Sequence, residues 1–260
     1  MTLFRPLCIS LSVGLLLASS SVAQADNIHI SGAVLQPGSY QWHAEARLRD
    51  ATVSGQVRAD AWFLGAALLR DSALEPQQRL KAGILFDLRV NKLHARNENN
   101  TTLLELVERL EQQVANMPVT GRIPAELNPF QLLIPRHNHL LEPGDQLVYP
   151  TRPAQIRVMG AVAADCELAF DPALTLRNYL RQCPVYPGVD RNLVHVIQPD
   201  GSVEEVGIAH WNAQPVNLAV GAVIYRPVNP GRLSPDTPEM NADIAALLAT
   251  QYRLGGHFSE

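Results

Sequence analysis

The sequence holds little cysteine, few aromatic residues and only one long apolar run. Of its 260 residues, 3 are cysteine and 6% are aromatic, so a metal site built on several cysteines is not expected. No run after residue 25 approaches the ~20 apolar residues that a membrane-spanning helix needs. The net charge of −4 shows no excess of lysine and arginine, which argues against nucleic acid as a partner.

The one apolar run lies near the N-terminus, in residues 7–18, and follows the positive charge of Arg5. Residues 22–25, Val-Ala-Gln-Ala, supply the small-x-small pattern that signal peptidase cleaves. These features predict a cleaved secretory signal peptide over residues 1–25, and therefore export of the mature chain. The alternative is that the run stays uncleaved as an N-terminal anchor helix.

Recognisable catalytic motifs are absent from the sequence. It has no nucleophile elbow, no His-Glu-x-x-His pair, no phosphate-binding loop and no dinucleotide fingerprint. His137 and His139 offer two metal ligands, but no third ligand is near them in the sequence, so an exposed loop is the simpler interpretation. We therefore expect no metal, no cofactor and no catalytic residue. Carboxylate pairs that cleave glycosidic bonds can be far apart in sequence, so a polysaccharide-modifying hydrolase or ligase is kept as an alternative.

Two cysteines follow the predicted signal peptide, Cys166 and Cys183. In an oxidising compartment such a pair more often forms a disulfide than a metal site. In the chain-entropy description, closing a loop of this size stabilises the fold by about 3 kcal/mol. Two buried free thiols are the alternative.

An internal repeat is the most informative feature of the chain. Residues 30–34, Ile-Ser-Gly-Ala-Val, return as Val-Met-Gly-Ala-Val at 158–162. Residues 141–150 likewise match residues 218–227. Each pair of segments is typical of the first and last strands of one folding unit. The two segments lie 51 residues further apart in the first copy than in the second, so the first copy carries an insertion.

The insertion has helical periodicity. Leu80, Ile84 and Leu88 recur every four residues, which places them on one helical face. A polar break over residues 97–100 is followed by a second helical pattern, for which Thr102 and Glu105 have the spacing of a capping box. We therefore predict a helical hairpin inserted at about 72–117.

The remaining pattern predicts an α+β fold of two β-grasp domains. Residues 26–43 indicate a hairpin turning at Pro37-Gly38, and the second copy adds a short helix starting near Asp171-Pro172. The first domain is expected over residues 26–151 and the second over residues 152–229.

Residues 230–260 are predicted to form a linker and a C-terminal amphipathic helix. Pro238 suits the first turn, capped by Asp236 or Thr237. Apolar residues follow at helical spacing, at Met240, Ile244, Leu247 and Leu248. Docking on the chain's own second domain is one interpretation of this helix. Docking on a partner, such as an oligomeric exporter, is a second interpretation. Contact with a membrane is a third, although the polar face lacks the lysine and arginine of interfacial helices.

Ordered short motifs resemble those of known modules. Residues 30–40 and 143–147 resemble soluble-ligand-binding β-grasp (SLBB) modules, and the whole chain after residue 25 resembles the GfcC family of periplasmic capsule proteins. The motifs that carry the second resemblance are residues 62–66, Asp71-Ser72, 120–124, Arg152-Pro153, 176–180, 209–212 and the terminal helix.

The resemblance implies a periplasmic, non-catalytic role in forming or exporting capsular or extracellular polysaccharide. The expected partners are polysaccharide or export proteins, and a structural partner of an outer-membrane exporter is an alternative. Membrane contact is expected only through the C-terminal helix, and a monomer is favoured. The resemblance places Arg122 beside a cavity next to the helical insertion. Arg122 and Trp62 are therefore the predicted binding residues, since a tryptophan face can stack on a sugar ring.

Overall fold

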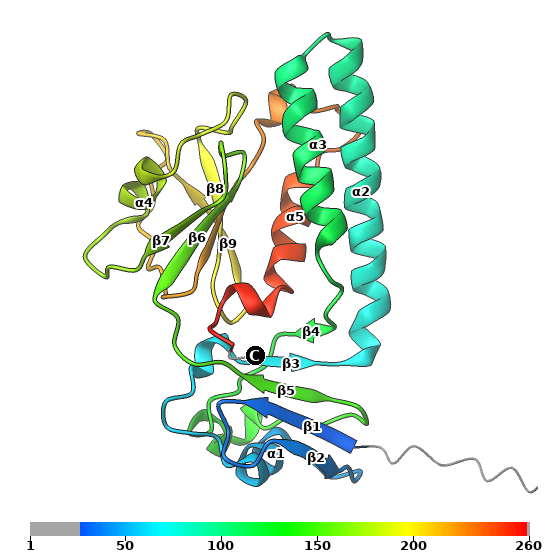
Figure 1. The fold of residues 1–260 in the computed structure, drawn as a ribbon, viewed down its shortest axis with the longest axis vertical. Coiled ribbons are helices and arrows are strands. Elements are labelled where there is room, and N and C mark those ends of the chain that lie inside the picture. The colour runs from blue at the N-terminus through cyan, green and yellow to red at the C-terminus, as the bar shows by residue number, and fades with distance from the viewer. Residues whose placement is uncertain (1–26, 259–260) are drawn as a thin grey trace, which may run out of the picture.

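A computed structural model describes residues 27–258 and shows two five-stranded sheets and five α-helices over this part of the chain (Figure 1). The predicted mixed α+β fold is confirmed. The predicted signal peptide lies outside the described residues. Within them, no helix is both long enough and apolar enough to cross a membrane.

The first sheet has the strand order β2-β1-β5-β3-β4. Its hairpin strands β1 and β2 are antiparallel, β1 runs parallel to β5, and β3 lies antiparallel between β5 and β4. A short helix, α1, packs against the hairpin strands β1 and β2. The bounds are Asn27–Gly32 for β1, Gly38–Gln41 for β2, Leu48–Gly55 for α1, Ala67–Leu69 for β3, Arg122–Ile123 for β4 and Gln146–Tyr149 for β5.

The second sheet has the order β7-β6-β10-β8-β9. It repeats the pattern of the first sheet, with an antiparallel hairpin, one parallel pair and two further antiparallel strands. The bounds are Gln155–Gly160 for β6, Cys166–Ala169 for β7, Leu176–Gln182 for α4, Leu193–Ile197 for β8, Val203–Gly207 for β9 and Val223–Arg226 for β10.

The two sheets also share their register. Gly32 pairs with Tyr149 in the first sheet, and Gly160 pairs with Arg226 in the second. Both glycines have positive φ, and a Cβ on Gly32 would lie 1.9 Å from the carbonyl oxygen of Tyr149. The sequence repeat therefore corresponds to a repeat in topology and in strand pairing.

A helical hairpin, α2 (Leu74–Asn97) and α3 (Thr101–Asn116), lies between β3 and β4 in the chain. Asn100 caps α3, because its side-chain oxygen accepts a hydrogen bond from the backbone N–H of Leu103 at 3.0 Å. The predicted capping box at Thr102 and Glu105 is wrong, since α3 begins at Thr101.

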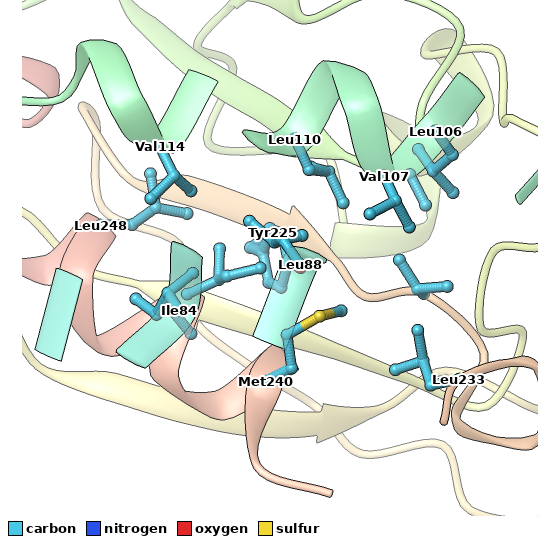
Figure 2. Packing of buried hydrophobic residues seen from close by; sticks show 14 of the residues in the cluster. Ile84, Leu88, Leu106, Val107, Leu110, Val114, Tyr225, Leu233, Met240 and Leu248 are labelled. Carbon is cyan, nitrogen blue, oxygen red and sulfur yellow. The ribbon is translucent and has the colours of Figure 1, made fainter. Parts of the chain in front are cut away.

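The helical hairpin packs on the second sheet rather than on the sheet from which it emerges (Figures 1 and 2). Helix α5 (Met240–Ala249) fills the space between them and contacts α2, β8 and β9. One apolar core joins the three helices to this face of the sheet. Its members include Ile84, Leu88, Leu106, Leu110, Val114, Val223, Tyr225, Met240, Ile244 and Leu248.

Helix α5 docks within its own chain. Its N-cap residue is Glu239, so the predicted cap at Asp236 or Thr237 is wrong and the helix begins after Pro238. Met240, Ile244 and Leu248 are buried in the shared core. The apolar face that suggested contact with a membrane or a partner is therefore covered by α2 and the second sheet.

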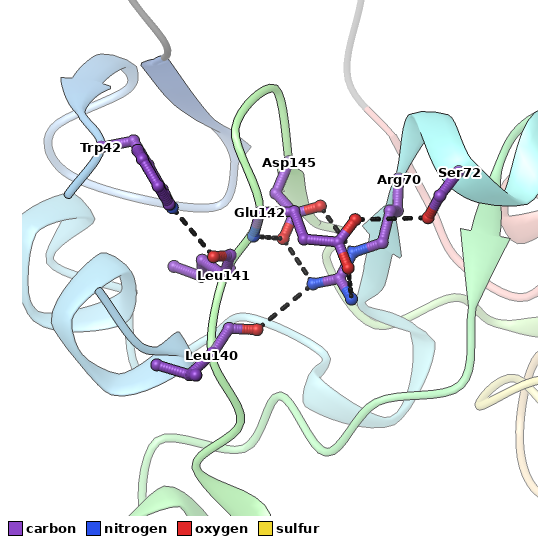
Figure 3. Close-up of polar contacts among 7 residues, drawn as sticks. All are labelled: Trp42, Arg70, Ser72, Leu140, Leu141, Glu142 and Asp145. Carbon is purple, nitrogen blue, oxygen red and sulfur yellow. Dashed lines mark hydrogen bonds and ion pairs between the residues drawn. The ribbon is translucent and has the colours of Figure 1, made fainter. Parts of the chain in front are cut away.

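The base of the helical hairpin is held by a buried ion pair (Figure 3). Arg70 donates from Nε to Asp145 at 2.9 Å and from a terminal nitrogen to its other carboxylate oxygen at 2.7 Å. Asp145 is fully buried and also accepts from the backbone N–H of Glu142. The Glu142 carboxylate lies 2.9 Å from the Arg70 guanidinium. The start of α2 is thus tied to the loop that enters β5.

A disulfide joins Cys166 at the start of β7 to Cys183 just after α4, with a Cα–Cα distance of 6.0 Å. Replacing both cysteines with serine is expected to lower the free energy of unfolding by about 3 kcal/mol, because the bond closes a 17-residue separation. Urea titration with and without reductant measures this difference. Reductant should destabilise the native chain and leave the serine variant unchanged; equal stability of the oxidised native chain and the variant would contradict the expectation.

Candidate functional site: a cavity between the two sheets

A cavity of about 1270 Å³ is lined by residues of both sheets and their connecting loops, which are called the first and the second unit below. Residues 59–64 and 124–128 come from the first unit, and residues 200–202 form the turn between β8 and β9 of the second. Arg152 lines the cavity from the segment that connects the two sheets. A cavity of this size can hold several sugar units.

The aromatic surface of the cavity comes from Phe63 and from Trp62. Trp62 precedes a 3-10 turn (Phe63–Gly65), and its backbone N–H donates to the carbonyl of Pro150 at 2.7 Å. The guanidinium carbon of Arg152 lies 4.8 Å from the centre of the Trp62 ring. The indole Nε1 is buried and has no hydrogen-bond partner among residues 27–258. The predicted binding residue Trp62 is therefore half-buried, lies in the cavity wall and is stacked with a cation.

Polar side chains surround this aromatic surface. The cavity lining includes the carboxylates of Asp60, Glu126 and Asp200, together with His137 and His139. Carboxylate and imidazole groups can form hydrogen bonds with a hydroxyl-rich ligand. Within residues 27–258, no three histidine, cysteine, aspartate or glutamate side chains are grouped so that they could hold one metal ion. The two histidines lie in an irregular segment, as expected: His137 ends a 3-10 turn (Pro135–His137) and is half-buried, and His139 is exposed in the loop that follows. Both also line the cavity.

The side chain of Asp200 stabilises the turn at residues 200–202, between β8 and β9. One carboxylate oxygen of Asp200 accepts from the backbone N–H of Ser202 at 2.9 Å and from its hydroxyl at 2.7 Å. Gly201 adopts a φ of 89° at the tip. The cavity wall contributed by the second sheet is therefore a preformed turn.

Arg122 lies behind this turn and joins three parts of the chain. Its guanidinium donates to the carbonyl oxygens of Pro199, Ala66 (3.3 Å) and Ala249 (3.2 Å). Only 7% of the residue is exposed, and burial lowers the pKa of Arg122 to about 10, opposed by the nearby charge of Asp200. A Cβ on Gly201 would lie 3.6 Å from the guanidinium. The structure shows a joining role for Arg122, whereas its binding role stays a prediction.

The helical hairpin positions Arg122 through its main chain. Gln77 of α2 donates to the carbonyl of Arg122 at 2.8 Å and accepts from the N–H of Gly121 at 2.9 Å. Gly121 has a φ of 72°, and a Cβ there would lie 2.7 Å from the carbonyl oxygen of Arg70. These contacts explain why a Thr-Gly-Arg sequence follows α3 and enters the short strand β4.

Sequence reasoning missed two contributors to the cavity. Arg152 was noted only as part of a motif, and its stacking on Trp62 depends on a three-dimensional approach. The turn at 200–202 is recognisable from Pro199-Asp200-Gly201, but its position against the first unit is not. Trp211, which shares the aromatic character of Trp62, lies elsewhere and is 77% exposed.

The topology and this cavity together define a mixed α+β protein in which two repeated sheet units border one cavity with an aromatic and polar lining. Residues 165–252 match the family described as capsule biosynthesis GfcC C-terminal. This match covers β7, α4, β8, β9, β10 and α5. The resemblance indicated by the sequence motifs is confirmed over these residues, which are similar to the C-terminal part of GfcC capsule biosynthesis proteins.

A comparison with curated proteins extends the likeness beyond the second sheet. The protein named "Uncharacterized protein YjbG" of Escherichia coli (strain K12) is 26% identical over 196 residues. The matched region covers 75% of this chain and 78% of that relative. Together with the family match, this similarity indicates involvement in the assembly of capsule or another polysaccharide.

Proposed function

We propose that the chain is a non-catalytic periplasmic protein that binds polysaccharide in the cavity between its two sheet units during capsule or exopolysaccharide assembly. In this proposal the units are SLBB-like β-grasp domains over residues 26–151 and 152–229. The first carries the helical hairpin at about 72–117, and residues 230–260 dock as linker and terminal helix.

The observation that carries the proposal is the pairing of Trp62 with Arg152 in the cavity wall. A tryptophan face matches the C–H face of a pyranose ring, and a cation above the ring polarises it. The surrounding carboxylates and imidazoles can pair with sugar hydroxyls. The family match to capsule biosynthesis supports the same class of ligand.

Trp62→Ala is expected to weaken binding of oligosaccharides prepared from the host's own surface polysaccharide at least about tenfold, because it removes the stacking surface. Isothermal titration calorimetry measures the affinity. Trp211→Ala is the matched control, since Trp211 does not line the cavity, and it should bind like the native chain. Arg152→Ala, at an exposed residue, gives a second variant that is expected to weaken binding without disturbing the core.

Three outcomes would count against the proposal. Equal loss of affinity in the Trp62 and Trp211 variants would move the site away from the cavity. Shortened or modified polymer after incubation would favour the hydrolase or ligase alternative, with Asp60, Glu126 and Asp200 as the acids to replace first. Absence of glycan binding together with capture of an outer-membrane exporter would favour the structural-partner alternative.

A further inference from the structure

Arg226 is a buried arginine without an evident partner. It is the last residue of β10 and is 6% exposed. Its Nε–H is buried and donates to no partner, and none of the ion pairs within residues 27–258 includes Arg226. Burial lowers the pKa of Arg226, while the nearby Asp190 opposes this effect. A buried guanidinium with an unpaired donor is costly unless another group pairs with it.

Asp190 is engaged elsewhere. Its carboxylate accepts from the backbone N–H of Asn192 at 2.6 Å and of Leu193 at 3.3 Å, which fixes the loop that enters β8. Only one carboxylate oxygen of Asp190 is used in this way, so Asp190 offsets part of the charge of Arg226 through space but forms no ion pair with it within residues 27–258.

The repeat gives an internal comparison for this position. Arg226 pairs with Gly160 as Tyr149 pairs with Gly32, so the two residues are equivalent in the two sheets. Tyr149 is fully buried, and its hydroxyl donates to the carbonyl of Leu127 at 3.1 Å. The first unit thus completes this position with a neutral, satisfied side chain. The second unit has a cation at this position.

Arg226 lines a pocket of the second unit together with two further arginines. The pocket has a volume of about 470 Å³ and is lined by Arg226, Arg177 and Arg181 together with the apolar side chains of Leu180 and Ile208. Arg177 donates to the carbonyl of Ala209 at 3.2 Å, and Arg181 donates from Nε to the carbonyl of Arg177 at 3.3 Å. Neither belongs to an ion pair formed within residues 27–258.

The helix that carries these arginines also differs from its counterpart in the first unit. Asn178 of α4 and Asp50 of α1 occupy the same capping position, so Arg181 corresponds to Val53. Val53 is exposed and uncharged. Two of the three arginines, Arg226 and Arg181, therefore stand where the first unit has an uncharged residue, whereas Arg177 corresponds to Arg49.

We propose that this pocket binds an anionic group, a carboxylate or a phosphate, carried by a ligand about the size of a monosaccharide. Guanidinium forks pair bidentately with both groups, and three of them bordering one pocket would compensate a ligand's negative charge. Leu180 and Ile208 offer an apolar surface for the C–H groups of the ligand. The pocket shares no lining residue with the cavity that contains Trp62, so the two sites can be tested separately.

The test is titration of the folded chain with sodium glucuronate and with inorganic phosphate, with glucose as the uncharged control. We expect saturable binding of at least one anion and none of glucose. Arg226→Gln and Arg226→Tyr, which copies the first unit, should each weaken binding at least about tenfold. Arg181→Gln tests the site at an exposed residue and should weaken binding severalfold, whereas Arg79→Gln on α2 is the matched control and should bind normally.

Preference for glucuronate would identify a carboxylated sugar as the ligand class, and preference for phosphate a phosphorylated one. The proposal is overturned if neither anion binds, if glucose binds as well as glucuronate, or if Arg181→Gln and Arg79→Gln bind equally well. If no anion binds at this pocket but oligosaccharide still binds at Trp62, the anion-site proposal fails and the proposed function is unaffected.

Discussion

Replacing Arg122 with alanine is expected to lower the free energy of unfolding by about 3 kcal/mol. The substitution removes a buried guanidinium that donates to carbonyls from the first unit, the β8–β9 turn and the end of α5. Those carbonyls would lose their donor in a buried location, and each unsatisfied group costs about 1–3 kcal/mol. Water entering the space left by the side chain would bond to some of these carbonyls. The expected loss of stability is therefore near the lower end of the sum of the three costs.

Urea titration followed by far-ultraviolet circular dichroism measures this effect. Arg79→Ala is the control, because Arg79 is an exposed arginine of α2 whose ion pair with Glu75 is worth roughly 0.5 kcal/mol or less. Arg122→Lys should fall between the two, since it keeps the charge but loses the planar donor fork. Equal stability of the Arg122→Ala and Arg79→Ala variants would contradict a joining role for Arg122.

The Asp145→Ala variant is expected to be destabilised by about 3–5 kcal/mol. Asp145 is fully buried, pairs bidentately with Arg70 and accepts a hydrogen bond from the Glu142 main chain. Hydrogen bonding to Asp145 raises the pKa of Arg70, which shows that the pair favours the charged guanidinium. Removing the carboxylate leaves a largely buried cation with only Glu142, at the exposed edge, to compensate it.

Hydrogen exchange measures the loss of stability in Asp145→Ala and shows which segments are affected. We expect faster exchange at the start of α2 and around β5 in Asp145→Ala, because the ion pair ties these segments together. Glu75→Ala, which breaks an exposed pair on the same helix, should change stability by roughly 0.5 kcal/mol or less. Comparable exchange and comparable stability in the two variants would show that the Arg70–Asp145 pair does not anchor the hairpin.

Local pattern predicts much of this fold. The period of Leu80, Ile84 and Leu88 predicts the first inserted helix, and the turn residues Pro37-Gly38 predict the hairpin of β1 and β2. The repeat around Gly32 and Gly160 indicated two similar units before their shared register was visible. These patterns are local in sequence, so they can be recognised without knowledge of the tertiary contacts.

What the sequence could not supply is the placement of one element on another. The periodicity of α2 does not reveal that its apolar face packs on α5 and the second sheet. Short helix α1 and the two-residue strand β4 carry too few residues to show a period. Capping was also misread, because Asn100 stands just ahead of the residues with capping-box spacing.

The same limit applies to the candidate site. Trp62, His137 and His139 were noticed for their residue types, yet only the fold brings them to one cavity. Arg122 was predicted to bind ligand, and the structure shows its donors directed at three main-chain carbonyls. No sequence pattern marks Arg226, because burial without a partner for its Nε–H is a property of the folded chain.

The central claim is that the cavity between the two units binds polysaccharide. Its most direct test is mapping of backbone amide chemical shifts while the protein is titrated with oligosaccharide fragments of the host's polysaccharide. We predict saturable shifts concentrated in residues 59–64, 124–128 and 200–202 and at the indole of Trp62, with the indole of Trp211 unmoved. Shifts confined to other surfaces, or no shifts at saturating glycan, would contradict the claim.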